Sequence, residues 1–187
     1  MAVRVNKSPI NVREKLNELD YGHVPYEKAS PGSIIQVSSY KITTKVDFTS
    51  TGYITAYTHT FNRKLPNSRL LHQFWAKSVL NTIGGANGQD FKITRDGASG
   101  SLFESSWQNY LNQSDYTADY YPPCNFQFVD EPPLTTEPLV YTFLGRKYGG
   151  SASSVQWSIG NTTFGNGNTD VTLGGSRGTW IIMEIKQ

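Results

Sequence analysis

The sequence predicts a mainly β protein: an antiparallel, jelly-roll-like β-sandwich preceded by a short N-terminal α-helix. Three observations lead to this expectation. Segments in which apolar and polar residues alternate recur roughly every ten to twenty residues from Ser33 to the C-terminus. Turn-forming pairs such as Asp96-Gly97 separate several of these segments. Apolar residues with helical spacing stand out at one place, close to the N-terminus.

The expected helix runs from Pro9 to about Leu19. Ser8 suits the N-cap, and proline is favoured at the first helical position because an N–H there would have no partner. A helix of about 11 residues is too short to persist alone in water, so its apolar stripe needs a partner. That partner is either the body of the same chain or a neighbouring subunit, and the sequence leaves both open. The apolar residues expected to dock are Ile10, Val12, Leu16 and Leu19.

The sequence divides into three parts. Residues 1–21 are expected to form an N-terminal attachment helix, residues 22–32 a hinge, and residues 33–187 the β-sandwich body. Proline and glycine recur in the hinge, and both residue types interrupt helices and strands. His23 lies in the hinge, where we expect it to be solvated.

About nine or ten strands are expected in the body, without a second helix, which fits two antiparallel sheets packed face to face. No repeat of fixed period points to a β-helix or a propeller. In the last strand, Ile181, Met183 and Ile185 are expected on one face, opposite Trp180 and Ile182. The expected strands lie within residues 34–48, 52–61, 68–82, 90–97, 101–107, 124–132, 139–148, 154–164 and 178–186.

Glycine-containing pairs mark the expected turns of the body. Asn87-Gly88, Asp96-Gly97 and Asn166-Gly167 all permit the positive φ angles that tight turns need. The longest irregular stretch, residues 109–123, is expected to be a surface loop rich in tyrosine and aspartate.

The composition argues against several classes of protein. Charged residues make up 17% of the chain and the net charge is +2 without a run of like charges, so we expect no nucleic-acid or membrane partner. No apolar stretch approaches the ~20 residues of a membrane span, and the N-terminus lacks the apolar core of a secretory signal, so we expect a soluble chain that is not exported. Cys124 is the single cysteine, which excludes an internal disulfide and favours a buried thiol.

No catalytic pattern emerges, and we expect neither an enzyme nor a bound cofactor or metal. The histidines at 23, 59 and 72 lack the spacing of metal ligands, and His59 and His72 sit in strand patterns that favour a structural role. No phosphate-binding loop and no nucleophile elbow occur. The adjacent carboxylates Asp130 and Glu131 should point to opposite faces of a strand, so they cannot share a substrate.

Aromatic residues gather in and beside the expected loop. Flat rings next to amide and carboxylate groups suit stacking on sugars or packing at a protein interface. The alternative is that two of these tyrosines only cap one end of the sandwich. The candidate ligand-binding residues are Trp107, Tyr110, Tyr116, Tyr120 and Tyr121.

Two sets of motifs resemble phage proteins. The opening "MAVRVNKSPINVREKLNELD" resembles a leader on marine and cyanobacterial phage structural proteins, where it precedes differing C-terminal domains. The body motifs "SPGSIIQV", "ITRDG", "FQFVDEP" and "GTWIIMEIK" are similar to those of a class of phage virion proteins. The chain departs from that pattern at residues 68–81, which are more aromatic, and at residues 109–123, which are expanded.

The resemblance implies a non-enzymatic virion protein, a fibre or decoration protein of the head or tail, docked to capsid, neck or tail proteins through its leader. By analogy with the trimeric jelly-roll heads of fibres, a homotrimer is expected. The alternative is a receptor-binding module that recognises a host surface glycan or protein through the aromatic loop. A depolymerase is a third interpretation, but such enzymes use a carboxylate pair that this sequence does not show.

Overall fold

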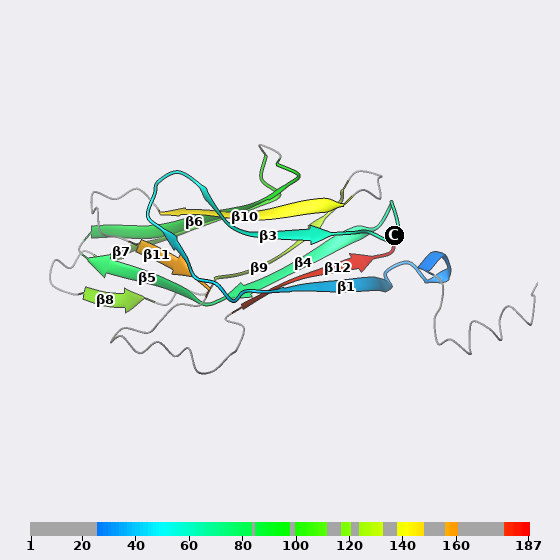
Figure 1. Ribbon diagram of the computed structural model, residues 1–187, viewed down its shortest axis with the longest axis horizontal. Helices are drawn as coiled ribbons and strands as arrows, with labels where there is room; N and C mark the ends of the chain where they lie inside the picture. The colour runs from blue at the N-terminus through cyan, green and yellow to red at the C-terminus, as the bar shows by residue number, and fades with distance from the viewer. Residues whose placement is uncertain are drawn as a thin grey trace, which may run out of the picture.

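A computed structural model describes residues 26–83, 85–97, 100–111, 117–120, 124–132, 138–147, 156–160 and 178–187 (Figure 1). These residues form a single 3-10 turn, η1 (Tyr26–Lys28), and twelve strands, as predicted for a mainly β protein. The strands are β1 (Ile34–Lys41), β2 (Val46–Phe48), β3 (Ile54–Phe61), β4 (Arg69–Ala76), β5 (Ser78–Ile83), β6 (Gly85–Arg95), β7 (Phe103–Leu111), β8 (Thr117–Tyr120), β9 (Cys124–Asp130), β10 (Leu139–Lys147), β11 (Gln156–Ile159) and β12 (Gly178–Ile185).

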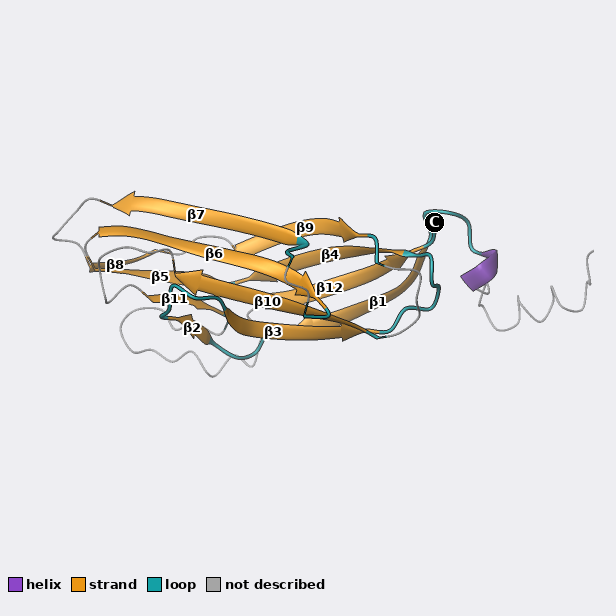
Figure 2. Cartoon of the chain, turned by 90° about the horizontal axis from the view of Figure 1, so that it is seen from above, coloured by secondary structure: helices purple, strands orange, loops and turns teal. Residues whose placement is uncertain are grey.

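The strands lie in two layers (Figures 1 and 2). One layer is the sheet β3-β10-β6-β7, and the other begins with the sheet β1-β12-β4-β9. A third set, β2-β11-β5-β8, repeats the order of the second layer, because its strands are the sequence neighbours of β1, β12, β4 and β9 in turn. It therefore extends that layer beyond the ends of its strands, and every pairing in the molecule is antiparallel.

The strand order is that of a jelly roll. When each continued pair counts as one strand, the eight strands read 1-8-3-6 in one layer and 2-7-4-5 in the other. Two interlocked Greek keys give this order. The predicted antiparallel sandwich is confirmed for the described residues. The predicted N-terminal helix lies outside them, as do residues 1–25 as a whole.

The core lies between the layers and is mostly aromatic. Trp180 and Ile182 face inward from β12, and Tyr141 and Phe143 face inward from β10; each is fully buried. Phe74 stacks on Phe143 with ring centroids 4.9 Å apart. Full burial of one such side chain stabilises the fold by about 1.5–3 kcal/mol. The predicted alternation of the last strand is therefore confirmed.

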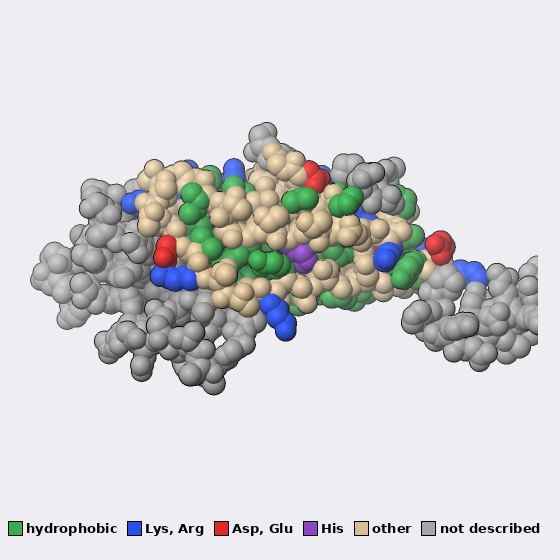
Figure 3. Space-filling model, viewed as in Figure 1, with side chains coloured by type: hydrophobic (Ala, Val, Ile, Leu, Met, Phe, Trp, Pro, Cys, Tyr) green, Lys and Arg blue, Asp and Glu red, His purple; other side chains and the backbone are tan. Residues whose placement is uncertain are grey.

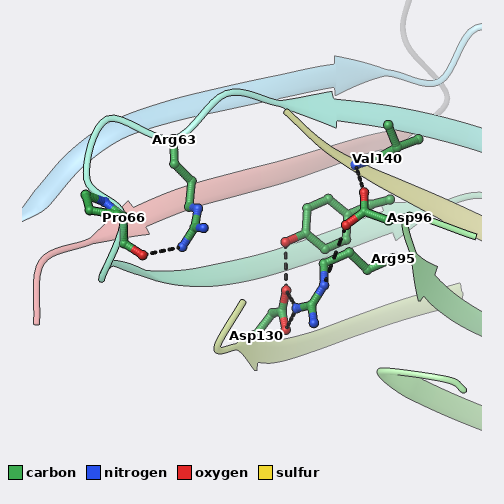
Figure 4. Close-up of polar contacts among 7 residues, drawn as sticks. Arg63, Pro66, Arg95, Asp96, Asp130 and Val140 are labelled. Carbon is green, nitrogen blue, oxygen red and sulfur yellow. Dashed lines mark hydrogen bonds and ion pairs between the residues drawn. The ribbon is translucent and has the colours of Figure 1, made fainter. Parts of the chain in front are cut away.

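Polar side chains also connect the layers (Figure 4). Asp130 of β9 accepts hydrogen bonds from Arg95 Nη1 at 2.5 and 2.6 Å and from the Tyr141 hydroxyl at 2.7 Å. Burial alone would lower the pKa of Arg95, but the hydrogen bond and the charge of Asp130 raise it. Burial first, and then Asp130, raises the pKa of Tyr141. This charged contact spans the two layers, and both charges have a partner.

A second buried carboxylate closes one end of the sandwich. Glu184 of β12 is fully buried and accepts hydrogen bonds from the backbone N–H groups of Lys64 and Leu65 and from the Ser68 hydroxyl. Gln36 Nε2 of β1 donates a further bond at 2.8 Å. These hydrogen bonds therefore hold the segment between β3 and β4 against strand β12.

The turn predictions fare differently. Asp96 and Gly97 have φ angles of 52° and 70°, so the predicted turn between β6 and β7 is confirmed. The predicted turn at Asn87-Gly88 is wrong, because both residues lie inside β6 and pair with β7. Asn166-Gly167 lies outside the described residues.

The expectation of one irregular stretch over residues 109–123 is also partly wrong. Strand β7 continues to Leu111, and β8 pairs with β5 in antiparallel register. Ladder pairing with neighbours outweighs the polar, turn-like composition that suggested a loop.

Candidate functional site

The outer face of the sheet β1-β12-β4-β9 is the candidate functional site. One residue from each strand lies side by side in the hydrogen-bonded register, so that an apolar line crosses the whole sheet. We call this line the apolar row. It consists of Val37, Met183, Leu71 and Val129.

The apolar row is open to solvent among the described residues. Val37 and Val129, at its two ends, are 59% and 54% exposed, and the two residues between them are half-buried. Trp75 and Ile34, on the same face, are 54% and 58% exposed. Isolated apolar residues on a surface need no explanation, but a contiguous group marks an interaction site.

Polar residues border the apolar row on both sides. Ser39, Gln73 and Gln127 lie along one side, interrupted by the half-buried Ile181. On the other side, Arg69 Nε and Glu131 Oε1 form an exposed ion pair at 2.9 Å. The apolar strip is thus one residue wide at Val129, and it is wider at the β1 end, where Ile185 and the exposed Ile34 lie beside it. Its length is three strand spacings, roughly 14 Å.

Strand β12 shows why this face differs from ordinary solvent-exposed sheet. Three of its outward residues, Ile181, Met183 and Ile185, are apolar, and so are the inward Trp180 and Ile182. An antiparallel strand with one wet face normally alternates apolar and polar residues, whereas a strand that is covered on both faces is apolar throughout. The sequence of β12 is therefore that of a strand with a covered outer face.

The edge of the sandwich adds little charge to this region. Figure 3 looks onto the edge where β1 and β3 lie in front, and hydrophobic side chains run along it with few charged ones between them. The apolar row starts on β1, so it begins at this weakly charged edge.

The histidines of the body are structural, as predicted. His72 is fully buried, stacks on Phe128 at 4.5 Å, and accepts a hydrogen bond from Trp180 Nε1 at 3.3 Å. Burial lowers its pKa to about 3. His59 shares a hydrogen bond with the Ser38 hydroxyl at 3.0 Å, and burial lowers its pKa too. Both rings are therefore neutral members of the core at neutral pH.

The remaining reactive groups also serve the fold. Cys124 is fully buried and free of a disulfide, and burial raises the pKa of its thiol, as expected for a packing residue. Asp130 and Glu131 point to opposite sides of β9, one to Arg95 and the other to Arg69, as predicted. Within the described ranges, no three His, Cys, Asp or Glu side chains are placed to hold a metal ion, and no described helix has the length and apolarity to cross a membrane.

The residues predicted to bind partners fall largely outside the described side chains. The docking residues Ile10, Val12, Leu16 and Leu19 precede the first described residue. Of the aromatic loop, Trp107 and Tyr110 belong to β7 and Tyr120 to β8, with their backbones alone described; Tyr116 and Tyr121 lie outside. Both sets remain predictions.

The comparisons with known proteins give distant likenesses. No protein-family model matches the chain, and no curated protein sequence matches it. Among solved structures, dimeric latent PorU from Porphyromonas gingivalis has a TM-score of 0.46 and 8% identity, over 84% of this chain and 14% of that one. The infectious bursal disease virus VP2 subviral particle has a TM-score of 0.36 and 13% identity, over 81% and 37%. The chain spans less than half the length of either structure.

Sequence reasoning missed the apolar row, although the signal was present. The alternation in the sequence of β12 predicts Met183 on the face opposite Trp180, which the structure confirms. What was missing was the strand order, which places Val37 of the first strand and Val129 of the ninth strand in line with it. A strand that is apolar on both faces was the one clue that the sequence offered.

Proposed function

We propose that this chain is a non-enzymatic structural protein of a bacteriophage particle, a fibre or decoration protein of the head or tail. Its β-sandwich is the displayed body, and its N-terminal segment docks it to the particle. The observation that carries the proposal is the apolar row on an outer sheet face, because subunits of an assembly expose such faces until they meet their neighbours.

The leader and body motifs support the same function. The leader resembles one that stands in front of differing domains on phage structural proteins, as a shared docking element would. The body resembles a class of virion proteins through four short motifs, two of which coincide with a turn and a strand of the fold. "ITRDG" forms the turn after β6, and "GTWIIMEIK" covers strand β12 with its apolar outer residues.

The buried ionisable groups fit a structural role. Asp130 and Glu184 are saturated by donors of the fold, and the two described histidines pack in the core. We propose a homotrimer, by analogy with trimeric fibre heads. Light scattering coupled to size-exclusion chromatography of the full chain tests this state, and a stable monomer at micromolar concentration contradicts it.

Immunogold electron microscopy of phage particles tests the function. Antibodies raised against the purified full chain should label intact particles of the phage that carries this gene at one structure: head, neck or tail. Antibodies against a host cytosolic protein serve as the control. If gold marks only the unassembled fraction of the lysate, the chain is not a virion component.

A further inference from the structure

The apolar row has dimensions that favour one kind of occupant. It is roughly 14 Å long across four strands, and polar residues border it on β4 and β9, whereas isoleucines continue it on β12 and at Ile34. A second sandwich packed face to face would also bury Gln73 and Gln127, whose amides would then need partners from the second copy. A narrower, amphipathic occupant fits better.

We propose that the amphipathic segment 9–19 of a second copy of this chain docks on the apolar row. As a helix, its 11 residues would measure about 16 Å, close to the length of the row. Its stripe, Val12, Leu16 and Leu19, offers apolar side chains on one side and charged ones on the other. Each partner covers the apolar side chains that the other exposes, as when an amphipathic helix binds in a hydrophobic groove.

The exit of the chain from the sandwich favours a second copy as the donor. Lys186 Nζ donates to the Glu27 carbonyl at 2.5 Å, and Gly32 N–H donates to the Lys186 carbonyl at 2.8 Å. These bonds hold η1 beyond the ends of β1 and β12, in line with the strands and away from the outer face (Figures 1 and 2). The first described residues therefore lie past the end of the sheet, and none of the described residues before β1 covers the apolar row of its own chain.

This inference deepens the proposed function and rests on it, since the copies must be gathered in one assembly. It names the partner of the docking segment as the body of a sister subunit. Each copy then donates one segment and receives another, a heterologous contact that gives a ring of copies when the rotation between neighbours closes. A homotrimer is one such ring.

Disulfide trapping in the full chain tests the contact. One sample carries Leu16→Cys, another carries Met183→Cys, and the two are mixed at micromolar concentration and oxidised. Met183 lies at the centre of the row, so we expect a disulfide between residues 16 and 183, identified by mass spectrometry of the linked peptides. Because each chain carries one new cysteine, and Cys124 is buried, this link joins two copies. The matched control pairs Leu16→Cys with Thr142→Cys on the opposite outer face.

Two further variants decide the outcome. Val129→Lys places a charge at an exposed end of the row and should lower the yield of the 16–183 link at least tenfold. Thr58→Lys, an exposed position on the other sheet, should leave it unchanged. Circular dichroism and thermal unfolding check that both variants fold. A chain carrying Leu16→Cys and Met183→Cys together that forms only intramolecular links overturns the proposal, as do equal yields from the row and its control.

The failure of this inference differs from the failure of the proposed function. If immunogold labels the particles but no 16–183 link forms between copies, the chain is a virion protein whose docking segment binds elsewhere. If the link forms but the particles carry no label, the contact exists without a virion role. If a different protein covers the apolar row, the chain should be found on particles but should not form the 16–183 link.

Discussion

The two outer faces of the sandwich share the same pleat but carry different side chains. On the β1-β12-β4-β9 sheet, the central line across the strands is the apolar row. On the β3-β10-β6-β7 sheet, the corresponding line is the exposed Thr58, the half-buried Thr142 and the buried Thr94, which we call the threonine row. Threonine has high strand propensity and a hydroxyl that water can bind, so this second face is suited to solvent.

The difference between the two outer faces distinguishes residues that stabilise the fold from residues that serve a contact with another molecule. Both layers bury similar aromatic and aliphatic residues in the shared core, such as Trp180 on one side and Phe143 on the other. The fold would therefore be served equally well by threonine on both outer faces. The apolar row adds nothing to the core, and its presence indicates a contact outside the single chain.

Of the changes considered, replacing the apolar row by threonines should weaken association between copies the most. A chain with Val37, Leu71, Val129 and Met183 all replaced by threonine should fold, because these side chains point away from the core. Removing about 1 kcal/mol of apolar burial per position weakens association by about 4 kcal/mol, or roughly a thousandfold. Sedimentation velocity over a concentration series measures the change.

The reverse exchange is the control for that prediction. Thr58→Val combined with Thr142→Val gives the other face an apolar line and should leave native association unaltered. If the quadruple variant associates as tightly as the wild-type chain, the two faces are equivalent in solution and the apolar row has no role in assembly.

The contact between Asp130 and Arg95 should stabilise the fold without affecting association at either outer face. Asp130→Asn removes the nearer carboxylate partner of Arg95 at the interface of the two sheets and leaves only Asp96, at 3.9 Å. We expect a loss of about 2–3 kcal/mol in the free energy of unfolding, below the value for a completely buried pair because part of Arg95 reaches solvent. Urea denaturation measures it.

The comparison is sharpened by measuring assembly in the same variant. Since Asp130 faces inward, association of the Asp130→Asn chain should match that of the wild type wherever the variant is folded. A change in association with unchanged stability would mean that the inner contact, and not the outer face, governs assembly.

Acid should weaken the core while leaving the outer faces alone. Burial lowers the pKa of His72 to about 3, compared with 6.5 in an ordinary environment. Between these values the unfolded chain binds a proton that the folded chain does not, so stability is full above pH 6.5 and falls as the pH decreases. The slope approaches about 1.4 kcal/mol per pH unit for one proton. Thermal unfolding from pH 7 to pH 4 records it.

A variant without the titrating ring isolates this effect. His72→Asn keeps an acceptor for Trp180 Nε1 but cannot be protonated. Its melting temperature should be lower at neutral pH, because the stacking on Phe128 is lost, and should vary less with pH. An unchanged pH slope in this variant would assign the acid sensitivity to other groups, with His59 as the next candidate.

How much the sequence could predict follows from the range of the interactions involved. Local alternation identified the strands and the inward side of β12, since side-chain period is a property of the strand itself. Asn87-Gly88 was misassigned because the ladder between β6 and β7 outweighs a local turn preference. The short polar strand β8 was missed for the same reason.

Features that depend on strand order escaped sequence analysis. The apolar row joins residues as distant as Val37 and Met183, and only the sheet places them in line. Glu184 carried a weaker signal: it is an acidic residue at an inward position of an otherwise apolar strand, which requires buried donors. The jelly-roll class was predictable, but the location of its contact surface was not.

The smallest effect is expected at the border of the apolar row. Arg69 and Glu131 form an ion pair in which both side chains are more than half exposed, so Arg69→Ala should change the free energy of unfolding by at most about 0.5 kcal/mol. The same change sits beside the proposed docking surface, where charge affects encounter rates more than affinity. Stopped-flow measurements at low and high salt should therefore show an association rate that depends on salt in the wild type. This salt dependence should be smaller in Arg69→Ala. Lys45→Ala, which breaks another exposed pair with Asp47 away from the row, is the matched control and should leave the rate unaltered. Equal rates in all three chains would place the contact on a part of the surface that these charges do not influence.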